Sequence, residues 1–308
     1  MKNKILILII AMLILTTACK NKDLSEKETD KLQIYTSVYP MYDFAKRIAK
    51  DRADVINIIP AGQEAHGWEP SSKELNALET ADVFIYNGAG LEHWVEKVLD
   101  NLNENVIFLE ASKGLELLEG HHDHDEHEHD EHDHGEYDPH TWLSIKNAIK
   151  EMENIKELLI KVDPENEEYF EENFQIEKAK FEELNRVFES ELKDLKNRKI
   201  VVNHEAFGYL ARDYNLEQIG IQGLNAETEP DPKRMAEIVE FIKDKKIDTV
   251  FTETLISSKV SETIANETGA KVLVLNPIEG LTEEELNDNK DYISIMKDNL
   301  ESLLKALK

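Results

Sequence analysis

The organisation of this chain is decided by the segment ENEEYFEENFQIEKAKFEELNRVFESELKDLKN (165–197). Its apolar side chains recur at steps of three, four and seven residues and are Phe170, Phe174, Phe181, Leu184, Phe188, Leu192 and Leu195. This spacing predicts one amphipathic helix, which would be about 50 Å long if unbroken. A helix of this length between two folded parts is a rigid connection, so we expect one lobe on each side of it.

Short apolar runs bounded by proline, glycine or asparagine lie on both sides of this segment. Before it they are LQIYTSVYP (32–40), ADVINIIP (53–60), ADVFIYNG (81–88) and NVIFLE (105–110). After it they are KIVVNHE (199–205), LEQIGIQ (216–222), DTVFTET (248–254) and KVLVLNP (271–277). Strands that alternate with helical stretches predict a mainly parallel sheet flanked by helices. We therefore expect an α/β fold of two such lobes, residues 32–164 and 198–308, joined by the long rigid helix.

Residues 1–18 have the pattern of a secretory signal peptide. Lys2 and Lys4 precede an unbroken apolar run from Ile5 to Leu15, and small residues follow. The run is too short to cross a hydrocarbon core, which needs about 20 residues. A basic start, a short apolar stretch and small residues at its end are typical of export signals. We expect a protein that acts outside the cytoplasm.

The only cysteine of the chain, Cys19, stands where this signal would be cleaved. The segment resembles the lipobox of bacterial lipoproteins, in which the cysteine becomes the acylated first residue. It departs from that pattern at Thr16, where leucine is usual. Residues 19–31 are polar and have no apolar period, which predicts a flexible tether. The predicted location is the outer face of the bacterial cell membrane, held by a lipid anchor.

The charge of the chain restricts its partners. The formal net charge is -28 at pH 7. Binding to nucleic acid needs a basic surface, and adsorption to anionic headgroups needs the same. Both are therefore excluded for the protein surface. A cationic ligand is the natural counterpart of such a field.

Residues 121–134 read HHDHDEHEHDEHDH and contain only histidine, aspartate and glutamate. Such a segment has no apolar surface to bury, so we predict a disordered loop over residues 119–136 within the first lobe. Imidazole and carboxylate groups bind zinc, copper and nickel. Without a scaffold the binding should be weak and labile. The histidines expected to contribute are His121, His122, His124, His127, His129, His132 and His134.

Three other histidines and one glutamate have a different setting. His66 lies in a loop after a predicted strand, His140 at the start of a predicted helix, and His204 at the end of KIVVNHE. Glu279 follows the strand KVLVLNP. Ligands of α/β sheets bind outside the carboxyl ends of strands, and three of these four residues have that position. Two come from each lobe, so we expect a shared site in the cleft between the lobes. His93 lies on a predicted helix and is interpreted as a surface or packing residue.

These motifs resemble the metal receptors of ABC importers, and within them the ZnuA/AdcA-like zinc receptors of solute-binding cluster A-I. The resemblance covers the chain from Ile34 onward and rests on the loop before EPS (69–71), DPHTWL (138–143), NHEAFGYL (203–210) and LNPIEGL (275–281). It implies two α/β lobes joined by one long helix, and a metal held in the cleft by His66, His140, His204 and Glu279. Glu64 is a possible alternative ligand. It also implies a monomeric receptor without catalytic activity, whose partner is an ABC permease with a cytoplasmic ATPase.

The ligand types set the expected metal. Manganese receptors that resemble this chain have a glutamate where His204 stands and an aspartate in the last segment. Three imidazoles and one carboxylate suit tetrahedral Zn²⁺, whereas manganese prefers more oxygen ligands. We predict that Zn²⁺ is the transported ligand. A receptor for manganese or another divalent metal is the alternative within the same family.

Two further alternatives belong to other classes of protein. A zinc hydrolase keeps an open coordination position for water. The pairs His127–Glu128 and His204–Glu205 both lack the second histidine of an H-E-x-x-H motif. Three histidines would leave such an open position only if Glu279 did not bind. The last alternative is a metal-buffering or adhesion protein without a permease; a two-lobed cleft argues against simple buffering but not against adhesion.

Overall fold

The computed structural model describes residues 31–120, 137–224 and 230–308. The predicted signal peptide, Cys19, nearly all of the tether and the seven histidines of 121–134 lie outside the described residues. In the part of the chain that is described, no helix is both long and apolar enough to cross a membrane. Residues Leu32–Lys308 form one compact unit.

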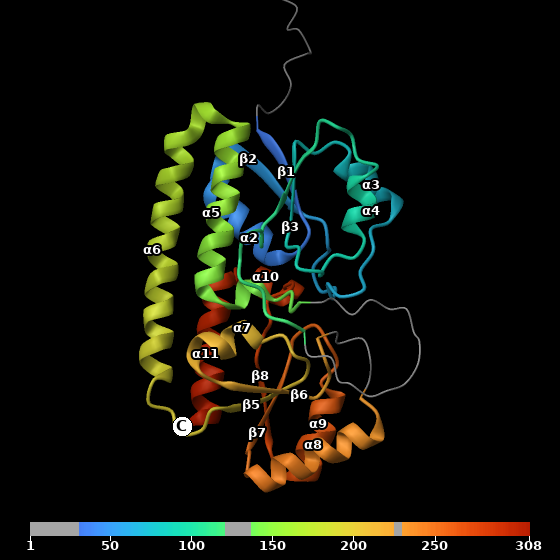
Figure 1. Cartoon of the computed structure of the whole chain (residues 1–308), viewed down its shortest axis with the longest axis vertical. Helices are drawn as coiled ribbons and strands as arrows, with labels where there is room; N and C mark the ends of the chain where they lie inside the picture. The colour runs from blue at the N-terminus through green and yellow to red at the C-terminus, as the bar shows by residue number, and fades with distance from the viewer. Residues whose placement is uncertain (1–30, 121–136, 225–229) are drawn as a thin grey trace, which may run out of the picture. The chain divides into compact units, whose positions relative to one another are not determined.

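The first lobe is built on a parallel four-stranded sheet with the order β2-β1-β3-β4. Its strands are β1 (Leu32–Thr36), β2 (Ala53–Asn57), β3 (Val83–Tyr86) and β4 (Ile107–Glu110). Its helices are α2 (Tyr39–Ala49), α3 (Ser72–Leu78), α4 (Val95–Leu99) and α5 (Ile145–Val162), with short 3-10 turns η1 (Lys50–Arg52) and η2 (Thr141–Leu143). In Figure 1, α5 lies on one side of the sheet and α3 and α4 lie on the other.

The second lobe repeats this arrangement with the order β6-β5-β7-β8, again all parallel. Its strands are β5 (Lys199–Val202), β6 (Glu217–Gly220), β7 (Thr249–Thr252) and β8 (Lys271–Val274). Its helices are α7 (Gly208–Tyr214), α8 (Pro232–Lys245), α9 (Lys259–Thr268), α10 (Glu283–Asn287) and α11 (Tyr292–Leu307). The predicted α/β fold of two parallel-sheet lobes is confirmed.

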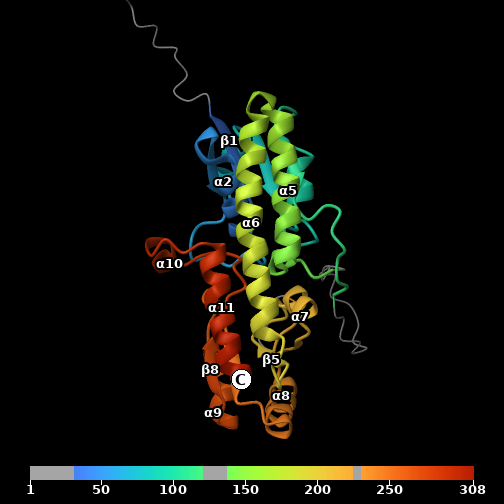
Figure 2. The ribbon, with the colours of Figure 1, turned by 90° about the vertical axis from the view of Figure 1, so that its left-hand side faces the viewer.

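The long helix between the lobes is α6 (Glu167–Leu192), which follows the 3-10 turn η3 (Pro164–Asn166). It packs against α2 and α5 of the first lobe and against α7 and α11 of the second (Figure 2). The prediction of a single helix over 165–197 was too long, because 26 helical residues measure about 39 Å. Beyond the helix, the Arg198 guanidinium donates to the carbonyl of Lys193 at 2.6 Å.

Aromatic side chains join α6 to both lobes. Phe181 of α6 stacks on Tyr292 of α11 with ring centroids 5.0 Å apart, and Phe44 of α2 meets Tyr292 edge-on at 5.2 Å. All three rings are fully buried. One apolar core therefore runs from the first lobe through the long helix into the second. The carboxyl ends of the strands are held in a fixed relation by this core.

Candidate metal centre

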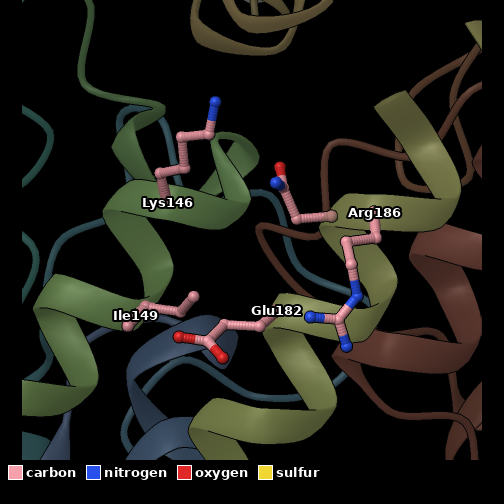
Figure 3. A pocket seen from close by; sticks show the side chains of 5 residues that line it. Lys146, Ile149, Glu182 and Arg186 are labelled. Carbon is pink, nitrogen blue, oxygen red and sulfur yellow. The ribbon is translucent and has the colours of Figure 1, made fainter. Parts of the chain in front are cut away.

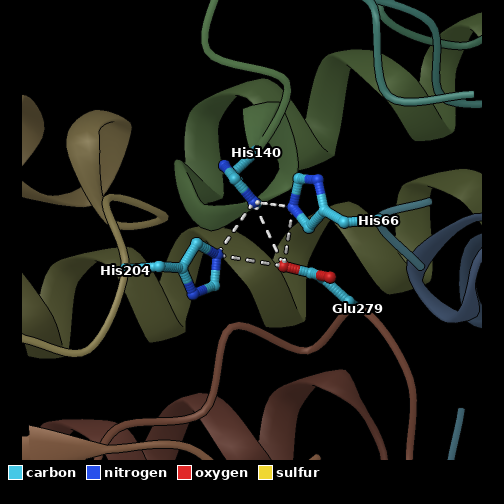
Figure 4. A group of neighbouring side chains, drawn as sticks. All are labelled: His66, His140, His204 and Glu279. Carbon is cyan, nitrogen blue, oxygen red and sulfur yellow. Dashed lines mark hydrogen bonds and ion pairs between the residues drawn. The ribbon is translucent and has the colours of Figure 1, made fainter. Parts of the chain in front are cut away.

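Four buried side chains from separate segments converge on one point (Figure 4). His66 lies in the loop between β2 and α3, His140 directly precedes η2, and His204 follows β5. Glu279 lies between β8 and α10. Their exposed fractions are 8% for His66, 0% for His140 and His204, and 2% for Glu279. The structure thus brings together the four residues that the sequence placed at one cleft.

Five of the six distances between the ligand-type atoms of these side chains are close to those of a tetrahedral shell. Nε2 of His140 lies 3.0 Å from Nε2 of His66 and 3.4 Å from Nε2 of His204. Oε1 of Glu279 lies 3.1 Å from His140 Nε2, 3.4 Å from His204 Nε2 and 3.5 Å from His66 Nε2. Ligand atoms about 2.05 Å from a tetrahedral Zn²⁺ are about 3.3 Å from each other. The observed distances scatter around this value.

Two further carboxylates decide which ring nitrogen faces the centre. Nδ1 of His140 lies 2.8 Å from Asp138 Oδ1, and Nδ1 of His204 lies 2.7 Å from Glu253 Oε1. A carboxylate accepts a hydrogen, so Nδ1 of each neutral ring carries the proton and Nε2 presents a lone pair. Lone pairs of two rings and the charge of Glu279 therefore face one another. A bound metal ion, or protons on the ring nitrogens, would make this arrangement favourable.

The pKa values of the three histidine rings result from two opposing influences, burial and the neighbouring carboxylates. Burial would lower the pKa of His204, but the Glu253 charge and hydrogen bonds hold it well above the usual value. Burial is likewise outweighed at His140, where hydrogen bonds to Asp138 and Glu279 raise the pKa. At His66 burial prevails and the pKa is lowered. Protons therefore occupy part of this centre when no metal does.

The carboxyl of Glu64 is not one of the four converging groups. Its Oε1 accepts from the backbone N–H of Ala65 at 3.1 Å. Burial, and then the neighbouring Glu279 charge, raise the pKa of Glu64 to about 10. Burial would raise the pKa of Glu279, but the charge of His66, and after it hydrogen bonds with a neutral Glu64 and with the other two histidines, hold this pKa well below its usual range.

Hydrogen bonds fix the loops that carry the ligands. Trp142 Nε1 donates to the carbonyl of Pro277 at 2.7 Å, which ties the His140 segment to the Glu279 segment. The Trp142 ring also meets the His140 ring edge-on at 5.5 Å. Asn87 Nδ2 donates to the carbonyl of Pro139 at 2.8 Å. The ligands are thus held by the protein before metal arrives.

Sequence reasoning missed Asp138 and Glu253. A faint signal for each existed: Asp138 stands two residues before His140, and Glu253 directly follows β7 at the carboxyl end of the sheet. His93 is exposed and takes no part in the cluster. A separate shallow pocket between α5 and α6 is lined by Lys146, Ile149, Glu182, Asn185 and Arg186, and contains none of the metal-centre residues (Figure 3).

Two parallel-sheet lobes, a long helix and a buried centre of three histidines and one glutamate define a two-lobed metal receptor. Residues 34–306 match the family described as zinc-uptake complex component A, periplasmic, and the chain belongs to this family. The predicted family is therefore confirmed.

Similar proteins and structures are consistent with this family assignment. The high-affinity zinc uptake system protein ZnuA of Bacillus subtilis is 41% identical over 98% of this chain and 97% of its own length. The zinc-binding lipoprotein AdcA of Streptococcus pneumoniae is 39% identical over 93% of this chain, which spans 57% of that relative. The crystal structure of the Zn(II)-bound ZnuA-like domain of Streptococcus pneumoniae AdcA has a TM-score of 0.78 at 38% identity, covering 90% of this chain and 99% of that one.

Proposed function

We propose that this chain is the extracytoplasmic zinc receptor of an ABC importer and that it binds one Zn²⁺ between its lobes. The observation that carries the proposal is the convergence of three histidine ring nitrogens and one carboxylate oxygen of Glu279 within 4.8 Å of one another. Nitrogen-rich tetrahedral sites suit zinc. The ligands of this proposal are His66, His140, His204 and Glu279.

The proposal favours capture and delivery over catalysis. Four protein ligands complete a tetrahedral shell, whereas catalytic zinc sites keep one position open for water or substrate. The family to which the chain belongs is described as a zinc-uptake component. An ABC permease with a cytoplasmic ATPase is therefore the proposed partner of a monomeric receptor.

The N-terminal proposals rest on sequence alone. We propose that residues 1–18 are removed, that Cys19 is acylated and that residues 19–31 tether the receptor to the outer face of the membrane. The AdcA relative is named a lipoprotein, which supports this proposal.

We also propose that the chain divides into two lobes, residues 32–164 and 198–308, with residues 165–197 as the connecting segment. The seven histidines of 121–134 are proposed as a set of labile sites that collects metal.

The test is zinc and manganese binding to the chelator-stripped protein, with and without residues 121–134. We expect both forms to keep one tight zinc site, and only the full chain to bind several more zinc ions weakly. Loss of the tight site with residues 121–134 would refute the assignment to His66, His140, His204 and Glu279. Tight manganese binding that zinc does not displace would refute the choice of metal.

A further inference from the structure

One tyrosine of the second lobe contacts the segment that carries a ligand of the first lobe. Tyr209 of α7 is fully buried. Its hydroxyl accepts from the backbone N–H of Leu118 at 3.0 Å and donates to the carbonyl of Asp138 at 2.9 Å. Leu118 and Asp138 are themselves paired, because Asp138 N–H donates to the Leu118 carbonyl at 2.8 Å. The Tyr209 hydroxyl thus connects the two chain segments that contain Leu118 and Asp138.

The side chain of Asp138 is held from the same helix. A Cβ atom at Gly208 would lie 2.5 Å from Asp138 Oδ2 and 3.5 Å from Leu118 Cδ1. Real Cβ atoms are not found so close to an oxygen, so the carboxylate occupies space that only glycine leaves free. Gly208 and Tyr209 together place both the main chain and the side chain of Asp138.

Asp138 in turn determines how His140 is oriented. Its Oδ1 accepts from the backbone N–H of His140 at 2.9 Å and from the ring Nδ1 at 2.8 Å. These two bonds fix both the start of the side chain and the rotation of the ring, and they leave Nε2 pointing at the centre. Groups that orient a metal-binding histidine in this way typically change metal affinity by about 10–100-fold when they are removed.

We propose that Gly208 and Tyr209 are positioning residues for zinc: through Asp138, the second lobe orients His140, a ligand of the first lobe. The inference rests on the proposed function. It means that the two lobes are coupled by more than the shared metal, because the contact with α7 supports a ligand before zinc binds. A displacement of α7 from Asp138 would loosen His140 and favour release of the metal.

The test compares two tyrosines of the same helix. Tyr209→Phe removes only the hydroxyl that contacts Leu118 and Asp138. Tyr214→Phe is the matched control, because Tyr214 is also buried on α7 and its hydroxyl donates to Asn185 Oδ1 at 2.9 Å, away from the metal centre. Chelator competition should show about tenfold weaker zinc binding in Tyr209→Phe and wild-type affinity in Tyr214→Phe.

Three further measurements separate positioning from a general loss of stability. The cobalt(II) absorption spectrum, which reports the geometry of a tetrahedral site, should change in Tyr209→Phe and Gly208→Ala but not in Tyr214→Phe. In an Asp138→Ala background, Tyr209→Phe should weaken zinc binding by less than twofold, because the intermediary is gone. The melting temperature of each zinc-free variant shows whether it is folded.

The outcomes are distinguishable. Wild-type protein without a tight zinc site would refute the proposed function itself. Tight zinc binding by the wild type that is unchanged in both Tyr209→Phe and Gly208→Ala would refute only the positioning role. An undiminished effect of Tyr209→Phe in the Asp138→Ala background would show that Tyr209 does not act through Asp138.

Discussion

At the scale of single residues, the metal centre is a set of sites where protons and zinc compete. The bonds from His140 and His204 to Asp138 and Glu253 use the Nδ1 hydrogens. Any additional proton must therefore sit on Nε2, the atom that a metal needs. The same carboxylates that orient the rings also make the rings more basic. The affinities of these rings for zinc and for protons are consequently raised together, so the pH determines which of the two is bound.

We expect the apparent zinc affinity to increase as the pH rises through the titration of His204. The pKa of His204 is held well above its usual value, so Nε2 holds a proton more tightly than an ordinary imidazole does, and zinc must displace that proton. The pKa of His140 is also raised, so this ring competes for a proton as well, and affinity should fall by about tenfold per pH unit for each proton released. His66, whose pKa is lowered, contributes least. Calorimetry in buffers of different ionisation enthalpy measures the proton release; a zinc affinity that is flat from neutral pH to about pH 5 would contradict this account.

A second prediction at this scale concerns metal choice. His204→Glu replaces one of three imidazoles by a carboxylate and places it near Glu253, which accepts from Nδ1 in the wild type. The variant centre has two nitrogens and two carboxylates, a set less suited to zinc and closer to what manganese prefers. We expect weaker zinc binding and a smaller preference for zinc over manganese in direct competition. His93→Glu, at an exposed position outside the cluster, is the control; a full zinc preference retained in His204→Glu would show that the imidazole count does not set selectivity.

At the scale of elements, the order of strands and helices could be predicted from the sequence, whereas some ends and contacts could not. Each strand lies within its predicted run, because alternating apolar runs and turn residues act locally. The end of α6 at Leu192 could not be predicted, because the apolar spacing continues to Leu195. The positions of His66, His204 and Glu279 after strands could be read from the chain. The partner of Asp138 on α7 could not, because Tyr209 is 71 residues from Asp138 along the chain.

Helix α5 supports the ligand loop through a buried acid. Thr141 Oγ1 lies 2.6 Å from Glu151 Oε1 and 3.1 Å from Asn87 Oδ1. A hydroxyl has one hydrogen, so it cannot donate to both acceptors. A neutral Glu151 resolves this by donating to Thr141, which then donates to Asn87. Burial raises the pKa of Glu151 to about 8, in agreement with this arrangement.

Glu151→Gln should therefore stabilise the zinc-free protein more at high pH than at low pH. The folded-state pKa of about 8 lies above the value of 4.5 that is usual for glutamate, so folding takes up a proton whenever the pH is between these values. The contribution of Glu151 to wild-type stability is thus lost as the pH rises from about 4.5 to about 8. Glutamine does not titrate, so the Glu151→Gln variant lacks this pH dependence. Between pH 5 and pH 7.5 the advantage of Gln should grow by about 2–3 kcal/mol in urea unfolding. Glu157→Gln, exposed on the same helix, should show no comparable trend; an equal effect of both variants would disprove a neutral Glu151.

At the scale of the whole unit Leu32–Lys308, one arginine links the two lobes and the long helix. Arg47 of α2 donates to Asp43 of the same helix at 2.5 Å, to Glu177 of α6 at 2.9 Å and to Asp291 at 2.8 Å. Asp291 also caps the start of α11 by accepting from Ser294 N–H. Asp43 and Glu177 are buried. The guanidinium is therefore the shared counterion of charges that belong to both lobes.

Removing this counterion should weaken the connection between the lobes before it weakens either lobe alone. Arg47→Met leaves Asp43 buried without its partner and Glu177 with only the exposed Lys180, and the loss of one partner of a buried ion pair typically costs about 3–5 kcal/mol. We expect the zinc-free variant to unfold in two transitions in place of one. Zinc should restore a single transition, because each lobe supplies two of its ligands. The first lobe supplies His66 and His140, and the second supplies His204 and Glu279. A ligand that binds only the folded state adds stability to it. Lys180→Met is the matched control: Lys180 is an exposed partner of the same Glu177 at 2.8 Å, so its loss should cost less than about 1 kcal/mol. A single transition in zinc-free Arg47→Met with wild-type stability would show that the aromatic core around Phe181 and Tyr292 holds the lobes together without the ionic cluster.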